Sequence, residues 1–232
     1  MAIHAVGRVV LENPLSLRAP SSDPSPPMRE QLIAAATRLF GVGGFGGTSL
    51  QSVADAVGIR KASLLYHFAS KEELRTAVMT SILGHWKDTL PQILLAATTG
   101  ERRFEAATEH AIDFFEKDPS RARFLLREGI DRPAEVRALL ADLLKPWIDM
   151  AAGFIRQGIK EGSVYEDVDP EAYIIQIIHL VVGGVASREA MGGLVSENQD
   201  TRARMRAELL RLTRAGLFKE ASSVETKNGQ LL

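Results

Sequence analysis

The chain contains no cysteine among its 232 residues, which excludes disulfides, thiolate metal sites and cysteine nucleophiles. Basic and acidic residues nearly cancel, at 28 and 29, so the formal net charge is −1. Bulk charge therefore does not indicate a nucleic-acid partner, and any attraction to phosphate must come from a local patch. Apolar residues make up 45% of the chain, enough to build a core without cross-links.

Long apolar runs are also missing. The most apolar stretch, residues 174–186, is shorter than the roughly 20 residues that a membrane-spanning helix needs, and it carries Gln176 and His179. No secretory signal is visible at the N-terminus. We therefore expect no membrane partner and a cytoplasmic location, which the lack of cysteine suits.

No convincing alternation of apolar and polar residues indicates a strand, whereas helical periodicity is present almost throughout from Arg29 onward. The predicted fold class is all-α. The proline- and serine-containing residues 1–27 are expected to form a disordered arm, and residues 221–232 a flexible tail. Between them we predict a small helical unit and a larger body, over 28–75 and 76–220. The helices expected in the body span 102–117, 120–129, 134–160, 170–191 and 201–218.

The glycines between Gly41 and Gly47 match the spacing of a dinucleotide-binding loop. That fingerprint must follow a strand and open a long helix, but here the glycines follow a helix, so this interpretation fails. We interpret them as a corner. Gly43 or Gly44 ends the first helix with a positive φ, Phe45 returns to the core, and Thr48-x-x-Gln51 begins the next helix as a capping box.

Residues 48–68 predict two short helices joined by a turn at Gly58, which is the layout of a helix-turn-helix. Leu64 and Phe68 are expected in the core between the helices. Ser70-x-x-Glu73 is a second capping box. Lys71 lies in the first turn of the helix that this capping box begins. The helix dipole disfavours a cation at that position unless an anion lies nearby.

The stretch from about Arg29 to Met79 resembles the tetracycline-repressor (TetR) family of transcriptional regulators. The residues that carry the resemblance are Leu39-Phe40, Gly44-Phe45, Thr48-Ser49, Ala54-x-x-x-Gly58, Lys61, Leu64, Tyr66-His67-Phe68 and Ser70-Lys71-Glu72-Glu73-Leu74. The resemblance implies a homodimer that binds a double-stranded, palindromic DNA operator through an N-terminal three-helix domain. It also implies a C-terminal helical domain for dimerisation and for a small-molecule effector.

The resemblance gives roles to eight residues of the N-terminal domain. Thr48 is expected to cap a helix and touch a phosphate, and phosphate contacts are also implied for Lys61, Tyr66, His67 and Lys71. Arg60, Ser63 and Leu65 are placed to reach base edges. Arg60, Ala62 and Leu65 depart from the commonest family pattern, which leaves the operator sequence open.

By the same resemblance, the effector is expected among the helices from Glu101 to Lys160, and the dimer interface at about 170–190 and 201–218. His110 and Arg127 are the polar groups expected to orient a ligand. The apolar candidates for lining its cavity, each of which could equally be ordinary core, are Phe104, Phe114, Phe124, Trp147, Met150 and Phe154.

Two further patterns in the body have ordinary interpretations. His110 and Asp113 share a helical face at a spacing that metal ligands use, but a solvated face is the commoner reason, and we expect no metal and no cofactor. The arginine-rich residues 201–214 suit a second nucleic-acid site or an amphipathic helix whose charges face water, and the apolar stripe beside them favours the helix.

The sequence therefore leaves two functional hypotheses. The first is a ligand-responsive transcriptional regulator, with repression the usual sign in the family and activation left open. The second is a helical enzyme that uses a pocket in the body, with the N-terminal unit as an interaction module. No nucleophile elbow and no cofactor motif supports the second, and the first is preferred.

Overall fold

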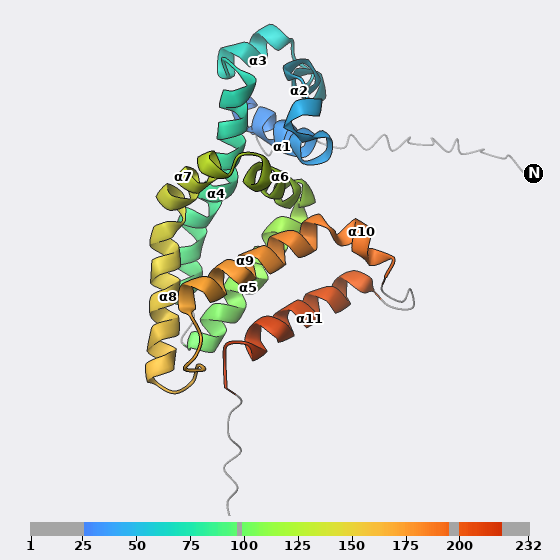
Figure 1. Cartoon of the computed structure of the whole chain (residues 1–232). Coiled ribbons are helices and arrows are strands. Elements are labelled where there is room, and N and C mark those ends of the chain that lie inside the picture. The colour runs from blue at the N-terminus through green and yellow to red at the C-terminus, as the bar shows by residue number, and fades with distance from the viewer. Residues whose placement is uncertain (1–25, 97–98, 195–199, 220–232) are drawn as a thin grey trace, which may run out of the picture.

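The computed structural model describes residues 26–96, 99–194 and 200–219, and these residues are predominantly helical (Figure 1). The helices, in chain order, are α1 (Met28–Gly47), α2 (Leu50–Val57), α3 (Lys61–His67), α4 (Lys71–Ala96), α5 (Gly100–Lys117), α6 (Pro119–Asp131), α7 (Pro133–Leu143), α8 (Lys145–Lys160), α9 (Pro170–Ala186), α10 (Arg188–Gly192) and α11 (Thr201–Ala215).

The first three helices form a unit at one end of the molecule, and α4 runs from that unit into the body (Figure 1). The body packs α5, α6 and α9 together, with α7 and α8 along one side and α11 beside α5. The predicted all-α class is confirmed for the described residues, where a single isolated bridge, Val164 with Phe218, is the one β-type pairing.

Several predicted boundaries differ from the structure. The helix expected over 134–160 is two helices, α7 and α8, because Pro146 can be accommodated only in the first turn of a helix. The helix expected over 170–191 is interrupted at Ser187. α4 continues across the expected boundary at residue 75. The predicted arm, apart from its last two residues, and the predicted tail lie outside the described residues.

The glycine corner forms at Gly44, whose φ of 74° breaks the helical path inside α1. Phe45 then packs 5.5 Å from the Phe40 ring, as predicted. The predicted cap was wrong by one residue, because Ser49 and Ser52 form the capping box of α2. The Thr48 hydroxyl instead turns back toward the carbonyl oxygens of Leu39 and Gly44, at 3.1 and 2.9 Å, which the corner leaves without helical partners.

Gly41 brings α1 against α6 at close range. A Cβ atom at this position would lie 2.6 Å from the Ser120 carbonyl oxygen and 2.8 Å from the Ser120 Cα. Because those atoms belong to the backbone and the first turn of α6, they cannot move aside cheaply. The absence of a side chain at Gly41 therefore sets the distance between the N-terminal unit and the body.

α11 is held against α5 by ion pairs. Arg206 pairs with Asp113 and lies 3.7 Å from Glu116, while Arg202 lies 3.1 Å from Glu116. At the other end of the helix, Arg214 pairs with carboxylates of the first turns of α5. The prediction that the charges of this helix face water was therefore wrong for Arg202, Arg206 and Arg214, whose carboxylate partners lie on α5. Arg211 pairs with Glu208 of the same helix.

Two histidines face each other between α4 and α5. The Nε2 atoms of His85 and His110 lie 3.2 Å apart, and the His85 ring stacks on Phe114 at 4.3 Å. Burial, with further contributions from His110 and Arg121, lowers the pKa of His85 below its ordinary value. At this distance the two Nε2 atoms can share one hydrogen bond, in which one nitrogen donates and the other accepts.

Within the described residues, none of the helices is both long enough and apolar enough to cross a membrane.

Gly41→Ala is expected to destabilise the protein by about 1–3 kcal/mol, because the added methyl group meets the backbone of α6. Gly84→Ala is the matched control: Gly84 lies in the middle of α4 with open space around it, and the same change there should stabilise by roughly 0.5–1 kcal/mol. Urea unfolding of both variants measures this. Equal effects of the two substitutions would contradict the close approach at Gly41.

Stability is expected to fall as the pH drops below about 6.5, the ordinary histidine pKa, because the unfolded chain takes up a proton that His85 resists in the folded state. His85→Gln keeps a hydrogen-bonding group but cannot titrate in this range. Urea unfolding at pH 7.5 and 5.5 should show a smaller loss for this variant. If the variant and the natural chain lost the same stability, His85 would not be the responsible group.

Candidate functional site

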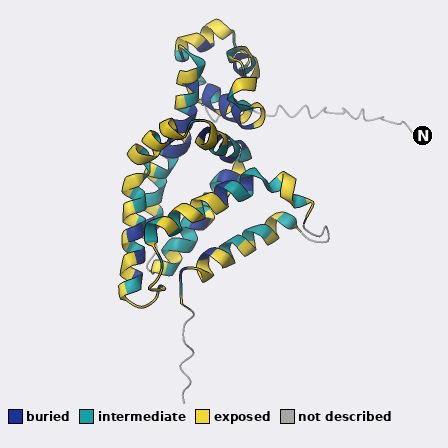
Figure 2. Cartoon of the chain, in the orientation of Figure 1, coloured by how far each residue is buried: buried dark blue, intermediate teal, exposed yellow. Residues whose placement is uncertain are grey.

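The outer side of α3 is an unusually exposed surface for a helix with large side chains (Figure 2). Tyr66 is 88% exposed and Leu65 40%, although both are side chains that normally gain from burial. On the opposite side of the same helix, Leu64 is fully buried, as is Phe68 just beyond its end, and both expectations are confirmed. The helix therefore keeps one side for the core and leaves the other without a partner in the monomer.

The structure groups five of the eight DNA-contact candidates on this surface. Lys61, Ser63, Leu65 and Tyr66 are exposed on α3, and Arg60 is exposed at its N-cap. The left-handed Gly58, with φ 77°, ends α2 and turns the chain into α3. Cationic, hydroxyl and apolar side chains thus lie together on one short helix that projects from the end of the molecule (Figure 1).

The other three candidates sit differently. Thr48 is 5% exposed and its hydroxyl is engaged by backbone carbonyls, so it is no longer free to act as a helix cap. His67 is half-buried beside Tyr66. The Lys71 ammonium lies 4.2 Å from the centroid of the Phe45 ring, and this cation–π contact gives a structural reason for a lysine at the start of α4.

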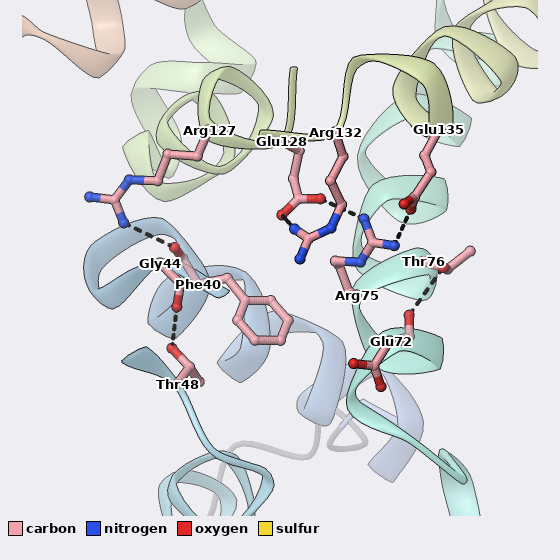
Figure 3. Close-up of polar contacts among 10 residues, drawn as sticks. All are labelled: Phe40, Gly44, Thr48, Glu72, Arg75, Thr76, Arg127, Glu128, Arg132 and Glu135. Carbon is pink, nitrogen blue, oxygen red and sulfur yellow. Dashed lines mark hydrogen bonds and ion pairs between the residues drawn. The ribbon is translucent and has the colours of Figure 1, made fainter. Parts of the chain in front are cut away.

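α6 holds the N-terminal unit through polar contacts (Figure 3). The Arg127 guanidinium donates to the carbonyl oxygens of Phe40 and Val42, at 3.4 and 3.2 Å. These carbonyls belong to the end of the first straight section of α1, where helical partners run out. Arg127 was predicted to orient a ligand; it points instead at the end of a helix.

Glu128, the neighbour of Arg127, is a buried carboxylate with an exposed fraction of only 2%. Arg75 of α4 donates to it at 2.7 Å, and Arg132, between α6 and α7, at 3.3 Å (Figure 3). Arg75 also bonds Glu135 of α7, which lowers the pKa of the Glu135 carboxyl. Burial would lower the pKa of Arg75, but its bonds to Glu135 and Glu128 outweigh that effect and raise it.

A cavity of about 1240 Å³ lies in the body, lined by residues of α4 to α9 and partly open, with the end of α11 at its margin. It is larger than the roughly 300–1,000 Å³ of most small-molecule pockets. Most of its wall is apolar, and both tryptophans of the chain, Trp86 and Trp147, belong to it. Leu125 and Leu126 of α6 line it too, so the helix that holds the N-terminal unit is also a wall of this cavity.

The structure brings three of the eight ligand candidates to this wall: Phe104, Trp147 and Phe154. The other five lie elsewhere: Arg127 at the end of α1, His110 against His85, Phe114 between His85 and Arg121, Phe124 stacked on Phe40 with 1% exposure, and Met150 on an exposed face of α8. Phe124 and Arg127 face away from the cavity because they lie on the side of α6 that meets α1. Ligand contact by the three wall residues stays a prediction.

One face of α9 leaves large apolar side chains uncovered. Ile175 and Leu180 are 38% and 46% exposed, while Val181 and Val185 are buried and Ile178 belongs to the cavity wall. On α11, Leu212 is 50% exposed beside the half-buried Leu209. Uncovered apolar side chains therefore lie on the two helices expected to form the dimer interface.

No group of three or more residues suited to metal binding occurs within the described ranges. Asp113, the acidic member of the pair considered for a metal, is bonded to Arg206.

Sequence reasoning missed the contacts of Arg75, Glu128 and Gly41. Nothing local marks them, because Arg75 and Glu128 are 53 residues apart and lie on different helices. In α6, the charged residues 127 and 128 stand on the side opposite an apolar stripe. This spacing does not show whether the charged side contacts another helix or solvent.

Comparisons with known proteins agree with this geometry. The family model described as bacterial regulatory proteins, tetR family, matches residues 32–78, which span the N-terminal unit and the start of α4. A second model, the C-terminal domain of tetracycline-repressor-like proteins, matches residues 100–207 in the body.

Curated relatives include the regulator RutR of Escherichia coli, 30% identical over a match that covers 64% of this chain and 69% of RutR. The repressor KstR2 of Rhodococcus jostii is 26% identical, over 62% of this chain and 71% of KstR2. The activator FasR of Mycolicibacterium smegmatis is 31% identical, but only over 47% of this chain and 50% of FasR.

Solved structures share the fold over most of the chain. KstR2 of Mycobacterium tuberculosis superposes with a TM-score of 0.65 and 21% identity, covering 84% of this chain and 97% of that one. FadR of Bacillus subtilis with stearoyl-CoA gives 0.63 and 18%, covering 81% and 98%. With both domains matched in order, the chain belongs to the tetR family of bacterial regulatory proteins.

Proposed function

We propose that this chain is a homodimeric transcriptional repressor whose two α3 helices read a palindromic operator, and whose cavity takes a small effector that changes the affinity for DNA. The observation that carries the proposal is the exposed side of α3, where Arg60, Lys61 and Tyr66 lie together on a surface that the monomer leaves uncovered. Named relatives include repressors and an activator, and repression is the sign we propose.

The chemistry of this surface suits a duplex groove. Lys61 and the Tyr66 hydroxyl supply contacts to phosphate, which fix the position of the protein on DNA without reading its sequence. Arg60 can donate two hydrogen bonds to a guanine, and Leu65 can pack against a thymine methyl group. His67 and Lys71 lie at the margin of the same surface and are proposed as further phosphate contacts. For Thr48 we propose contact through the neighbouring amides at the start of α2, because its hydroxyl is occupied and its own amide donates to the Phe45 carbonyl at 3.4 Å.

The cavity is the proposed site of the effector. Two structural neighbours with this fold hold acyl-CoA ligands, FadR with stearoyl-CoA and AibR with isovaleryl-CoA and operator DNA. Phe104, Trp147 and Phe154 are the predicted contacts that the cavity wall retains. The path to DNA runs through α6, because Leu125 and Leu126 face the cavity while Arg127 and Glu128 hold the N-terminal unit and α4. An effector acts only as far as it favours one position of α6 over another.

The homodimer is proposed to form through α9 and α11, whose uncovered apolar faces would be buried between two copies. Such a pair would present two α3 helices to one side of a duplex, about 34–36 Å apart, and so select a palindrome. Because it acts on operator DNA, we place the protein in the cytoplasm. The alternative of a helical enzyme is not favoured, because the matched relatives are regulators.

Lys61→Ala and Tyr66→Ala are expected to weaken operator binding by removing phosphate contacts. Selection of bound genomic fragments first supplies an operator. Gel shifts at several salt concentrations then give the slope of log K against log salt concentration. For Lys61→Ala this slope should be less steep by about 0.9 for each phosphate that the variant no longer neutralises. Lys160→Ala, an exposed lysine at the opposite end of the molecule, is the control and should bind as the natural chain does. Specific binding that is insensitive to both α3 substitutions would overturn the assignment.

Leu180→Glu combined with Leu212→Glu is expected to give monomers, because two charges would be buried at the proposed interface. Light scattering on the natural chain should give twice the 25.3 kDa of one copy, and the double variant should approach a single copy and lose operator binding. Leu95→Glu, at an exposed leucine on α4 outside the proposed interface, is the control. A natural chain that stays monomeric at micromolar concentration would refute the dimer.

A further inference from the structure

We propose that the effector is an amphipathic anion, with an apolar body enclosed in the cavity and an anionic group held by Arg214 at the end where α5, α8 and α11 meet. This rests on the proposed function, which places the effector in the cavity. It adds the chemical class of the effector, its direction in the cavity and the residue that distinguishes it from neutral compounds.

Most of the interior of the cavity is hydrocarbon, and outside its charged end the polar side chains of the wall are few: Thr108, His179 and the indole groups of Trp86 and Trp147. Away from the α5, α8 and α11 end, the wall is built mainly of aliphatic and aromatic side chains from α4, α6, α7 and α9. Thr108 is a polar side chain there, and its hydroxyl already donates to the Phe104 carbonyl at 2.9 Å. A polar group on the enclosed part of a ligand would lose its water without gaining a partner, so that part must be apolar.

The charged residues of the wall gather at a single end. Glu101 and Arg103 stand in the first turn of α5, Glu161 directly follows α8, and Arg214 and Lys219 belong to the last turn of α11 and the segment after it. Contacts in the structure tie these segments together. Arg214 pairs with Glu101, the Lys219 amide donates to the Ser163 carbonyl at 3.0 Å, and Arg103 lies 4.7 Å from the Phe154 ring.

Arg214 is the cation best placed to recognise an anion at this end. Its present partners are Glu101 and Glu105, and the side chains of the Arg214–Glu101 pair are 59% and 39% exposed. Exposed ion pairs contribute little to stability, so exchanging Glu101 for an anion of the ligand costs little. The planar guanidinium forms paired hydrogen bonds with a carboxylate or a phosphate, and a neutral hydroxyl cannot replace them.

The exchange of Glu101 for a ligand anion also affects the proposed dimer interface. Glu101 and Glu105 are two of the carboxylates of α5 that hold α11, and α11 carries part of the proposed dimer face. An anion that takes Arg214 from them releases one end of α11 from α5. Occupancy of the cavity is thereby sensed at a helix of the interface as well as at α6.

The test uses the full chain and three probes with the same hydrocarbon body: laurate, lauroyl-CoA and dodecanol. Trp86 and Trp147 both line the cavity, so quenching of tryptophan fluorescence reports binding directly. We expect at least one anionic probe to bind about tenfold more tightly than dodecanol, the difference expected for a charged hydrogen-bond partner. Preference for laurate indicates recognition of a carboxylate, and preference for lauroyl-CoA indicates recognition of phosphates.

Two substitutions with opposite expectations keep the result independent of folding defects. Arg214→Gln should bring the ratio of anion to dodecanol affinity close to one. Glu101→Gln, which removes one of the two carboxylate partners of Arg214 and leaves Glu105, should strengthen binding of the same anionic probe several-fold. Arg211→Gln is the matched control, because Arg211 lies on the same helix, pairs with Glu208 and is not part of the wall.

Each remaining outcome bears on a separate claim. Equal binding of dodecanol and the anions overturns the amphipathic anion while leaving the cavity as the effector site. Absence of any quenching by all three probes overturns the inference, and operator binding by the same preparation, measured by gel shift, then decides whether the regulator assignment also fails. Anion binding that is unchanged in Arg214→Gln removes Arg214 as the recognising residue.

Discussion

The fold depends on one buried carboxylate. Glu128 is almost fully enclosed, and a charge in such a place is tolerated only when its oxygens are bonded. Its partners, Arg75 and Arg132, come from α4 and from the junction of α6 with α7. Satisfying one side chain therefore ties α4, the helix that leaves the N-terminal unit, to α6, the helix that supports that unit. Removing either arginine would weaken that joint from inside.

α6 separates two environments that the protein must connect. One side of this helix contributes Leu125 and Leu126 to the cavity, and the other holds α1 through Arg127 and the close approach of Ser120 to Gly41. A ligand in the cavity, as proposed, would therefore lie one helix away from the N-terminal unit. Because closely packed interiors shift as units rather than deform continuously, a change on the cavity side reaches α1 without a chain of intermediate residues.

How much of this could be predicted depended on how local the cause was. The helix-turn-helix followed from short-range signals: the left-handed Gly58, the apolar spacing that buries Leu64 and Phe68, and the glycine corner at Gly44. The cap of α2 was misplaced by one residue because Thr48 and Ser49 are both good caps, and the free carbonyls of the corner, which no spacing reveals, attract the Thr48 hydroxyl.

The body resisted prediction for the opposite reason. Phe104 and Phe124 look alike in the sequence, as aromatic residues in amphipathic helices, yet one lines the cavity and the other stacks on Phe40. Periodicity shows that a face is buried and does not show which helix covers it. Arg206 and Asp113 are 93 residues apart, so their pairing depends on the assembled fold alone.

The attachment of α11 to α5 through arginine–carboxylate pairs has a consequence for any study at varied ionic strength. Added electrolyte shields these internal contacts as well as those made with a nucleic acid. Counterions therefore act on the attachment of α11 to α5 within the regulator itself. The number of DNA charges neutralised on binding, when it is counted from such a titration, includes a contribution from the protein's own row of opposite charges.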